Sequence, residues 1–206
     1  MIKKQNLSAA PGVRMPTLAE AMLDSLMMPS AATRALTGSA LVVFGSLLLA
    51  VSAQFKIPLY PVPVTGQTLV VLLIGMTYGA RLGGITIAAY LFEGALGLPV
   101  FAGGAAGVAV LVGPTGGYLF GFLLASAAMG YLAERGMGRT AASTITAMVI
   151  GNCVIYLCGV FWLANFIGFD KAVAAGVLPF LYGDALKLFV AAGLMPLAWR
   201  AVTSLK

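Results

Sequence analysis

The sequence predicts an all-α integral membrane protein with a bundle of six transmembrane helices. Three observations lead to this fold class. Hydrophobic residues make up 61% of the 206 residues and charged residues only 9%, a share of apolar side chains that no soluble core requires. The apolar residues gather in six segments. The basic residues are distributed unequally between the two ends of these segments.

The six apolar segments approach the length of about 20 residues that a helix needs to cross a bilayer. We expect the spans at residues 36–53, 66–80, 83–98, 117–133, 141–164 and 178–200. Together they would form one transmembrane domain over residues 36–206. An even number of spans places both termini on the same side of the membrane.

The distribution of lysine and arginine orients this bundle. The side that holds both termini carries Lys3, Lys4, Arg14, Arg34, Arg81, Arg135, Arg139, Arg200 and Lys206. The opposite side carries only Lys56 and Lys171. Because basic residues concentrate on the cytoplasmic side, we expect both termini in the cytoplasm. The net charge of +6 therefore reflects topology and does not indicate nucleic acid as a partner.

Residues 1–35 would form a cytoplasmic N-terminal segment ahead of the first span. We expect no signal peptide there, because the first apolar span starts late and has no cleavage-like end. Thr17 and Glu20 make a capping box that would begin a short amphipathic helix, and Pro29 would end it. Two interpretations stay open: the helix lies on the membrane surface, or the segment is a disordered tail.

The loops expected on the outer side are residues 54–65, 99–116 and 165–177. The first two are apolar and rich in proline or glycine. Irregular apolar backbone at a membrane surface must pack against protein or line a cavity. We expect these two loops to cover a cavity; the alternative is that they only plug the outer end of the bundle.

Only three ionisable residues fall well inside the spans, namely Glu93, Asp184 and Lys187. Charges at this depth are costly and usually functional. Asp184 and Lys187 are three residues apart, so they share a helix face and can pair. The pair either locks helices together or belongs to a ligand site. Glu93, which has no partner in this scheme, favours the ligand site.

Further polar and aromatic side chains fall in the outer half of the spans. Asn152 and Tyr156 are one turn apart on the fifth span, Tyr90 and Glu93 are neighbours on the third, and Tyr118 begins the fourth. A mixture of acceptors, a cation and aromatic rings suits a small polar ligand with an apolar body. We therefore expect an outward-facing site formed by these residues and the acid–base pair of the sixth span.

The residues do not assemble into an enzyme. The chain has no histidine, which excludes a histidine–metal site, general base or proton relay. Cys153 and Cys158 are not spaced as a redox pair. No Gly-x-x-x-x-Gly-Lys-Ser/Thr motif is present, so any ATP hydrolysis would belong to another chain. We expect no catalytic residues, no metal and no cofactor.

Small residues on the first span form a possible contact surface for another helix. Gly38, Gly45 and Ser52 recur every seven residues, and Ser46 and Ala50 make a small-xxx-small pair. Such residues let a second helix approach closely. That helix belongs either to this bundle or to a second protein, with a homo-oligomer as one possibility.

Five stretches resemble the BioY family, whose members are the biotin-specific substrate-binding components of energy-coupling-factor (ECF) vitamin transporters. In order they read PVPVTGQTLVVLL, ARLG, LGLPVFAGG, GPTGGYLFGF and, in the sixth span, Asp-x-x-Lys. The resemblance covers about residues 36–200. It implies an ECF S-component-like bundle that captures biotin from outside.

The resemblance also implies site residues. The family's span-six Asp and Lys line the pocket and match Asp184 and Lys187, and loops matching 54–66 and 99–117 close over the ligand. Gln67, in the first matching stretch, joins the expected substrate-binding residues. Many members carry an arginine after PVFAGG, where this chain has alanines, so the group that meets the biotin carboxylate stays open.

The chemistry of biotin agrees with these residues. Its ureido ring has two N–H donors and one carbonyl acceptor. Asp184 can accept from the N–H groups, Lys187 can donate to the carbonyl, and Asn152 can do both. Aromatic rings and methyl groups would hold the thiophane ring, and the valerate would lie nearer the outer loops.

The implied setting is a multi-pass protein of the bacterial cytoplasmic membrane, with biotin and membrane lipid as partners. Family members can pair with a transmembrane coupling protein and two ABC-type ATPases, and some occur without them. The alternative function is an ion- or proton-coupled secondary transporter of another solute, with Glu93 and Asp184 titrating. The short chain without a clear inverted repeat argues against it, and an intramembrane enzyme or structural subunit is less expected still.

Overall fold

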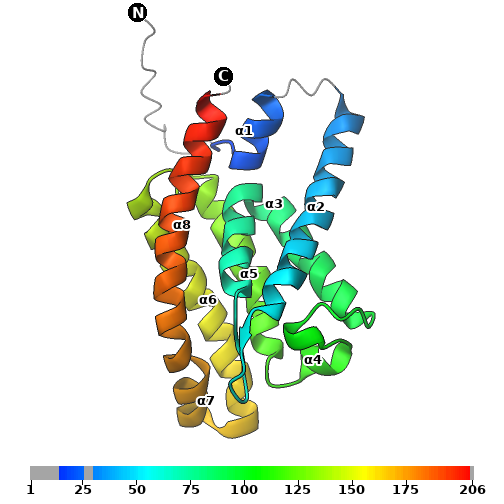
Figure 1. The fold of residues 1–206 in the computed structure, drawn as a ribbon, viewed down its shortest axis with the longest axis vertical. Helices are drawn as coiled ribbons and strands as arrows, with labels where there is room; N and C mark the ends of the chain where they lie inside the picture. Colours follow the sequence, from blue (N-terminus) through cyan, green and yellow to red (C-terminus); the bar gives the residue numbers. More distant parts are fainter. Residues whose placement is uncertain (1–13, 26–29, 205–206) are drawn as a thin grey trace, which may run out of the picture.

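The computed structural model describes residues 14–25 and 30–204 and shows a bundle of long helices (Figure 1). The long helices are α2 (Ala31–Gln54), α3 (Gln67–Ala95), α5 (Gly116–Ala133), α6 (Ala141–Ile167) and α8 (Leu178–Ser204). The short elements are α1 (Leu18–Ser25), the 3-10 turn η1 (Ala102–Gly104), α4 (Val108–Val112), α7 (Phe169–Gly176) and the strands β1 (Lys56–Ile57) and β2 (Val64–Thr65). The two strands pair antiparallel, with Lys56 opposite Thr65.

Within the described residues, five helical segments are long and apolar enough to cross a membrane. They are α2, α3, α5, α6 and the stretch Phe169–Ser204, which holds α7 and α8. The sequence led us to expect six spans. The difference lies in α3, because this one element covers most of both the 66–80 and the 83–98 segments.

Gly79 divides α3 into two parts that fold back on one another. Its φ of 86° and ψ of 173° leave helical geometry, and such a backbone is essentially reserved for glycine. A methyl group placed on Gly83 would lie 3.1 Å from the Cα of Gly75. In a continuous helix these positions would be about 12 Å apart. The two parts of α3 therefore run antiparallel, side by side.

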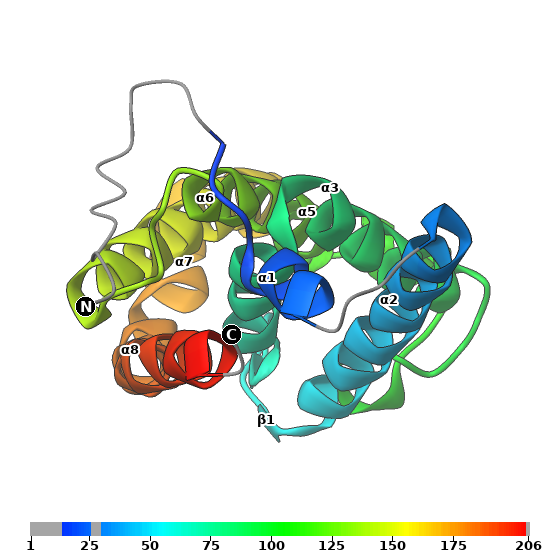
Figure 2. The same cartoon turned by 90° about the horizontal axis from the view of Figure 1, so that it is seen from above.

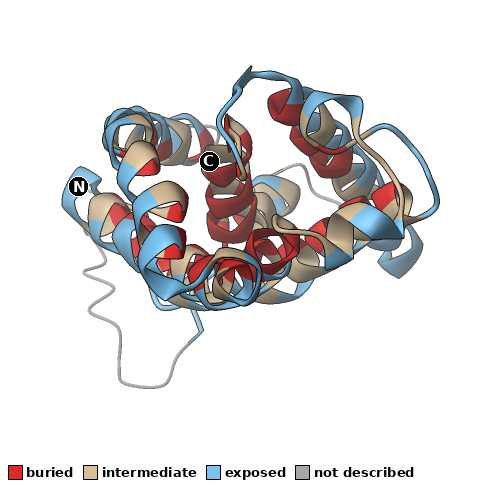
Figure 3. Ribbon diagram, turned by 90° about the horizontal axis from the view of Figure 1, so that it is seen from below, coloured by how far each residue is buried: buried red, intermediate tan, exposed pale blue. Residues whose placement is uncertain are grey.

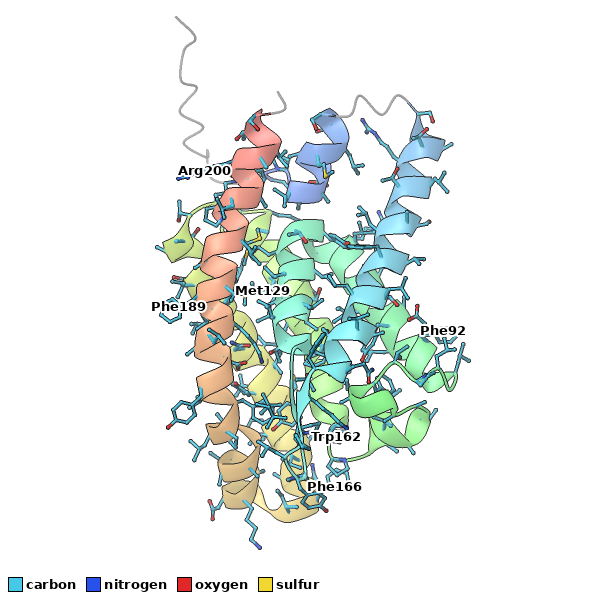
Figure 4. All side chains as sticks on the ribbon, in the orientation of Figure 1. Phe92, Met129, Trp162, Phe166, Phe189 and Arg200 are labelled. Carbon is cyan, nitrogen blue, oxygen red and sulfur yellow. The ribbon has the colours of Figure 1, made fainter. Side chains whose placement is uncertain are left out.

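Apolar side chains cover the outside of the bundle. Phe92 and Phe189 are 64% and 72% exposed and point away from the bundle (Figure 4). Met129, by contrast, is fully buried among the helices. Figure 3 shows the buried residues on the faces that the helices turn toward one another. An apolar surface of this extent is not stable in water, so the chain is a multi-pass membrane protein.

The loops gather at the two ends of the bundle. The β1–β2 hairpin, α4 and α7 lie at one end of the bundle, and α1, the start of α2 and the end of α8 lie at the other (Figure 1). The three loops expected outside thus share one end, which we call the loop end. α2 begins at Ala31, so the expected domain limit at residue 35 falls inside a helix.

The predicted capping box of the N-terminal helix is present. Glu20 N–H donates to Thr17 Oγ1 at 3.3 Å, and Thr17 N–H donates to Glu20 Oε2 at 2.9 Å. The helix packs against α3 and α8 and lies across the helix ends (Figure 2). This finding corrects the disordered-tail alternative for residues 14–25. Residues 26–29, with the expected stop at Pro29, lie outside the described residues.

Polar contacts hold this segment on the bundle. Arg14 forms ion pairs with Glu20 at 2.8 Å and Glu134 at 3.2 Å. Met15 N–H donates to the Glu134 carbonyl oxygen at 2.7 Å. The Glu134 carboxylate also accepts from Ala80 N–H at 3.1 Å. The Arg14 hydrogen bond, helped by this N–H, lowers the pKa of the Glu134 carboxyl below its ordinary value.

Candidate functional site

A cavity lies inside the bundle at the loop end, and about 180 Å³ of it is open to the centres of water molecules. Its walls come from the first two loops and from α3, α5, α6 and α8. The lining residues are Val62, Pro63, Thr65, Gln67, Thr68, Phe101, Ala102, Ala105, Val110, Thr115, Tyr118, Leu119, Phe122, Ile155, Tyr156 and Phe180. Apolar walls with a few placed polar groups are typical of a small-molecule site.

Aromatic rings form one wall of the cavity. Tyr118 and Phe180 stack with ring centroids 6.0 Å apart, and Tyr156 meets Phe180 edge-on at 6.2 Å. The Tyr118 hydroxyl donates to the Gly176 carbonyl oxygen at 2.9 Å, which fixes the ring against α7. Rings held from behind in this way present a preformed flat surface to an apolar ring system.

A charged cluster joins α3, α6 and α8 next to this wall. Lys187 Nζ lies 2.9 Å from Asp184 Oδ1 and donates to Thr68 Oγ1 at 2.7 Å. The Tyr156 hydroxyl donates to the other Asp184 carboxylate oxygen. Asp184 is only 3% exposed. Pairing and hydrogen bonds offset the cost of burying the charges. Thr68 and Tyr156, which bond to the ion pair, also line the cavity.

A second hydrogen-bonded chain holds the glycine-rich loop over the cavity. Gln67 Nε2 donates to the Tyr90 hydroxyl at 2.7 Å, and that hydroxyl donates to the Val100 carbonyl oxygen at 2.9 Å. Tyr90 is fully buried and meets Phe101 edge-on, with ring centroids 5.5 Å apart. Tyr90 therefore holds the loop against α3 through Val100 and Phe101, and Phe101 forms part of the cavity lining.

Three of the eight residues predicted for the site line the cavity: Gln67, Tyr118 and Tyr156. Three more stand directly behind lining residues: Asp184, Lys187 and Tyr90. These six come together as one site.

The other two predicted residues lie elsewhere. Glu93 accepts a hydrogen bond from Ser46 of α2 and is not part of the lining. Asn152 is buried in α6 at 7% exposure and does not line the cavity either. Among the described residues, no hydrogen bond or ion pair joins Glu93 to Asp184. The two carboxylates that a proton-coupled mechanism would use therefore have different partners, Ser46 for Glu93 and Tyr156 with Lys187 for Asp184.

Sequence reasoning missed several lining residues. Phe180 precedes Asp184 by one helical turn on the same face of α8, so helical spacing could have revealed it. Thr68 follows Gln67 directly, but its contact with Lys187 depends on how α3 and α8 pack. Phe101 and Ala105 enter the lining only because their loop returns over the bundle.

Lys56 lies against the glycine-rich loop, next to a residue that lines the cavity. A methyl group placed on Gly103 would collide with Lys56 Nζ, so this ammonium group sits against the backbone of η1. Gly103 also has a φ of +70°, which favours glycine. The neighbouring residue Ala102 lines the cavity. The β1–β2 hairpin therefore brings a cation to the glycine-rich loop that covers the site.

Comparison with known proteins places the chain in a family. The sequence profile of the BioY family matches residues 22–204. The biotin transporter BioY of Thermotoga maritima is 46% identical over 147 residues, which are 70% of this chain and 85% of that protein. The probable biotin transporter BioY of Pyrococcus horikoshii is 44% identical over 140 residues, which are 68% of this chain and 82% of that protein.

A solved structure has the same fold. It is the crystal structure of the S-component for biotin from an ECF-type ABC transporter, which superposes with a TM-score of 0.74 at 22% identity. The superposition covers 83% of this chain and 95% of the other. The fold is thus that of an ECF S-component, and by its sequence the chain belongs to the BioY family.

Proposed function

We propose that this protein binds biotin at the outer side of the membrane and takes it up as the substrate-specific S-component of an ECF-type transporter. The observation that carries this proposal is the cavity at the loop end, where aromatic walls meet the hydroxyls of Thr68 and Tyr156. Membership of the BioY family supports biotin as the ligand. The protein contributes binding and passage, and it does not act as an enzyme.

The proposed topology has six crossings, with the two antiparallel parts of α3 counted separately. Both termini then face the cytoplasm, and the residues before α2 form a cytoplasmic segment ahead of the transmembrane substrate-binding domain. The excess of lysine and arginine at the end that holds α1 supports this orientation. The loop end and its cavity then face outward from the cytoplasmic membrane.

The polar cluster is suited to the ureido ring of biotin. The ring offers two N–H donors and one carbonyl acceptor, and Thr68 and Tyr156 line the cavity with hydroxyls that can donate or accept. Asp184 and Lys187 stand behind them and fix their hydrogen-bonding directions. We assign the ureido contacts to these hydroxyls, with the ion pair supplying charge from behind.

The remaining parts of biotin fit the other walls. The stacked rings of Tyr118 and Phe180 suit the apolar thiophane ring. The valerate would then extend toward the loops, where Lys56 lies against Gly103 beside the lining. We assign the carboxylate to Lys56, since a charge-assisted hydrogen bond is among the stronger contacts available to it.

We infer that the energy for release of biotin comes from other chains. The sequence has no phosphate-binding loop motif, which supports pairing with a transmembrane coupling protein and two ABC-type ATPases. Action as a solitary transporter or as a homo-oligomer is the alternative arrangement. Uptake of biotin by cells with and without coupling subunits distinguishes these arrangements.

Titration calorimetry of biotin into the detergent-purified protein tests the proposal. We expect tight, stoichiometric binding without ATP, at least roughly tenfold weaker in Asp184→Asn, because a hydrogen-bonded charge is lost behind the cavity. Asp170→Asn, at the exposed first turn of α7, is the matched control and should bind like the wild type. A folded wild-type protein that does not bind biotin would refute the assignment.

A further inference from the structure

A second cavity lies at the opposite end of the molecule, between α1, α2 and α3. About 930 Å³ of it is open to the centres of water molecules. Three arginines line it, Arg14, Arg34 and Arg81, together with apolar side chains that include Val42, Leu82 and Ile85. We call this cavity the arginine groove. It shares no lining residue with the cavity at the loop end.

Two of the three arginines are free to bind an anion. Arg14 is held by Glu20 and Glu134, the two acidic residues of the lining. Arg34 and Arg81 are exposed, and neither has an acidic partner within residues 14–25 and 30–204.

The two carboxylates are engaged elsewhere. Glu20 also accepts from Thr17 N–H, and Glu134 from Ala80 N–H. Their charge is thus directed at Arg14 and the backbone, which leaves the guanidinium groups of Arg34 and Arg81 uncompensated. The lining as a whole carries three positive and two negative charges, a net charge of +1.

The groove changes from cationic to apolar with depth. Arg34 lies in the first turn of α2, and Val42 lies about 12 Å further along that helix. Arg81 begins the second part of α3, and Ile85 lies about 6 Å further along and is 47% exposed. An occupant that matches both regions needs an anionic head at the helix ends and an apolar tail along α2 and α3.

We propose that the arginine groove binds an anionic phospholipid. Its phosphate lies between Arg34 and Arg81, and an acyl chain follows Val42, Leu82 and Ile85. Basic pockets between transmembrane helices on the cytoplasmic side take anionic head groups, and this end is cytoplasmic in the proposed topology. A free phosphate shares the head-group chemistry but does not use the apolar wall. The bound lipid joins α1, α2 and α3.

Native mass spectrometry of the detergent-purified full chain tests this site. The probes are phosphatidylglycerol, phosphatidylcholine with the same acyl chains, and inorganic phosphate. We expect phosphatidylglycerol to bind preferentially and its affinity to fall roughly 30-fold in Arg34→Gln/Arg81→Gln, as expected for the loss of two basic contacts. The charge-preserving Arg34→Lys/Arg81→Lys protein should bind within about threefold of the wild type.

The matched control is Arg135→Gln/Arg200→Gln, which removes two exposed arginines from the same end without touching the groove. Figure 4 shows Arg200 near the end of α8 that lies opposite the loop end. An equal loss of affinity in this control would mean diffuse charge attraction and overturn the site. Equal binding of phosphatidylcholine, or displacement of the lipid by millimolar phosphate, would also overturn it. Thermal unfolding without lipid confirms that each variant is folded.

Discussion

Thr68 and Lys187 are joined by a 2.7 Å hydrogen bond that links α3 to α8. Thr68 lines the cavity, and Lys187 does not. We therefore expect the largely buried ion pair of Lys187 and Asp184 to act on a ligand through the hydroxyls of Thr68 and Tyr156. On this hypothesis the charges have two roles: they link three helices, and they orient the hydroxyl groups that would touch the ligand.

The two roles can be separated by a double substitution. Asp184→Asn should destabilise the protein by about 3 kcal/mol, because Lys187, whose side chain is only 14% exposed, loses its charged partner. Asp184→Asn/Lys187→Met should recover most of that stability and still bind biotin poorly. Thermal unfolding and calorimetry on the same samples provide the two readouts. Recovery of biotin binding in the double variant would show that the pair is only structural.

Tyr156→Phe keeps the ring of the aromatic wall and removes the hydroxyl that bonds Asp184. We expect biotin affinity to fall roughly tenfold, the usual effect of losing a hydrogen bond to a charged group. Tyr182→Phe is the matched control, because Tyr182 is 87% exposed on the outside of α8. Calorimetry that gives the same affinity for both variants would remove Tyr156 from the site.

Lys56→Ala tests the assignment of the biotin carboxylate. Biotin affinity should fall roughly tenfold as a charge-assisted contact is lost, and the affinity for biotin methyl ester should stay the same. Lys171→Ala removes the other lysine of the loop end and serves as the control. An equal loss of affinity for biotin and for its methyl ester would indicate that Lys56 supports the loop conformation and does not contact the carboxylate.

The contact of α1 with the bundle should depend on pH. Because Arg14 lowers the pKa of the Glu134 carboxyl, this ion pair stabilises the docked state fully above the ordinary carboxyl pKa of about 4.3. The stabilisation is lost as the pH falls from there through the lowered pKa of the folded state. Hydrogen exchange of the α1 amides, corrected for intrinsic rates, should rise in this acidic range.

Two variants check the origin of that pH dependence. Glu134→Gln should raise α1 exchange at neutral pH and abolish the acid-dependent step. Asp24→Asn changes an exposed acid of the same helix and should leave the step in place. A step that persists in Glu134→Gln would assign it to another group.

Gly79→Ala should destabilise the fold by about 1–3 kcal/mol, because alanine is strained at a φ of +86°. The added methyl would also lie 2.9 Å from both Glu134 Oε1 and Thr17 Cγ2. Gly84→Ala, in the same element, meets nothing within 4 Å and is the matched control. Thermal unfolding should separate the two variants, and equal stability would show that the reversal of α3 tolerates other residues.

The sequence alone determined where the long helices lie along the chain. Each expected span overlaps a long helix. Thr17 pairs with Glu20, and Asp184 pairs with Lys187, as their spacing in the sequence predicts. These features are local. Hydrophobic length defines a span, and helical periodicity defines which side chains share a face within one helix.

Only the tertiary structure decided which faces meet. Glu93 and Asp184 were both expected at the site, yet Glu93 bonds Ser46 of α2, and Asp184 bonds Tyr156 of α6. Depth along a helix does not define its rotation toward its neighbours, which depends on close packing across all of the helices. The fold-back of α3 at Gly79 and the return of Phe101 over the cavity depend on that same packing.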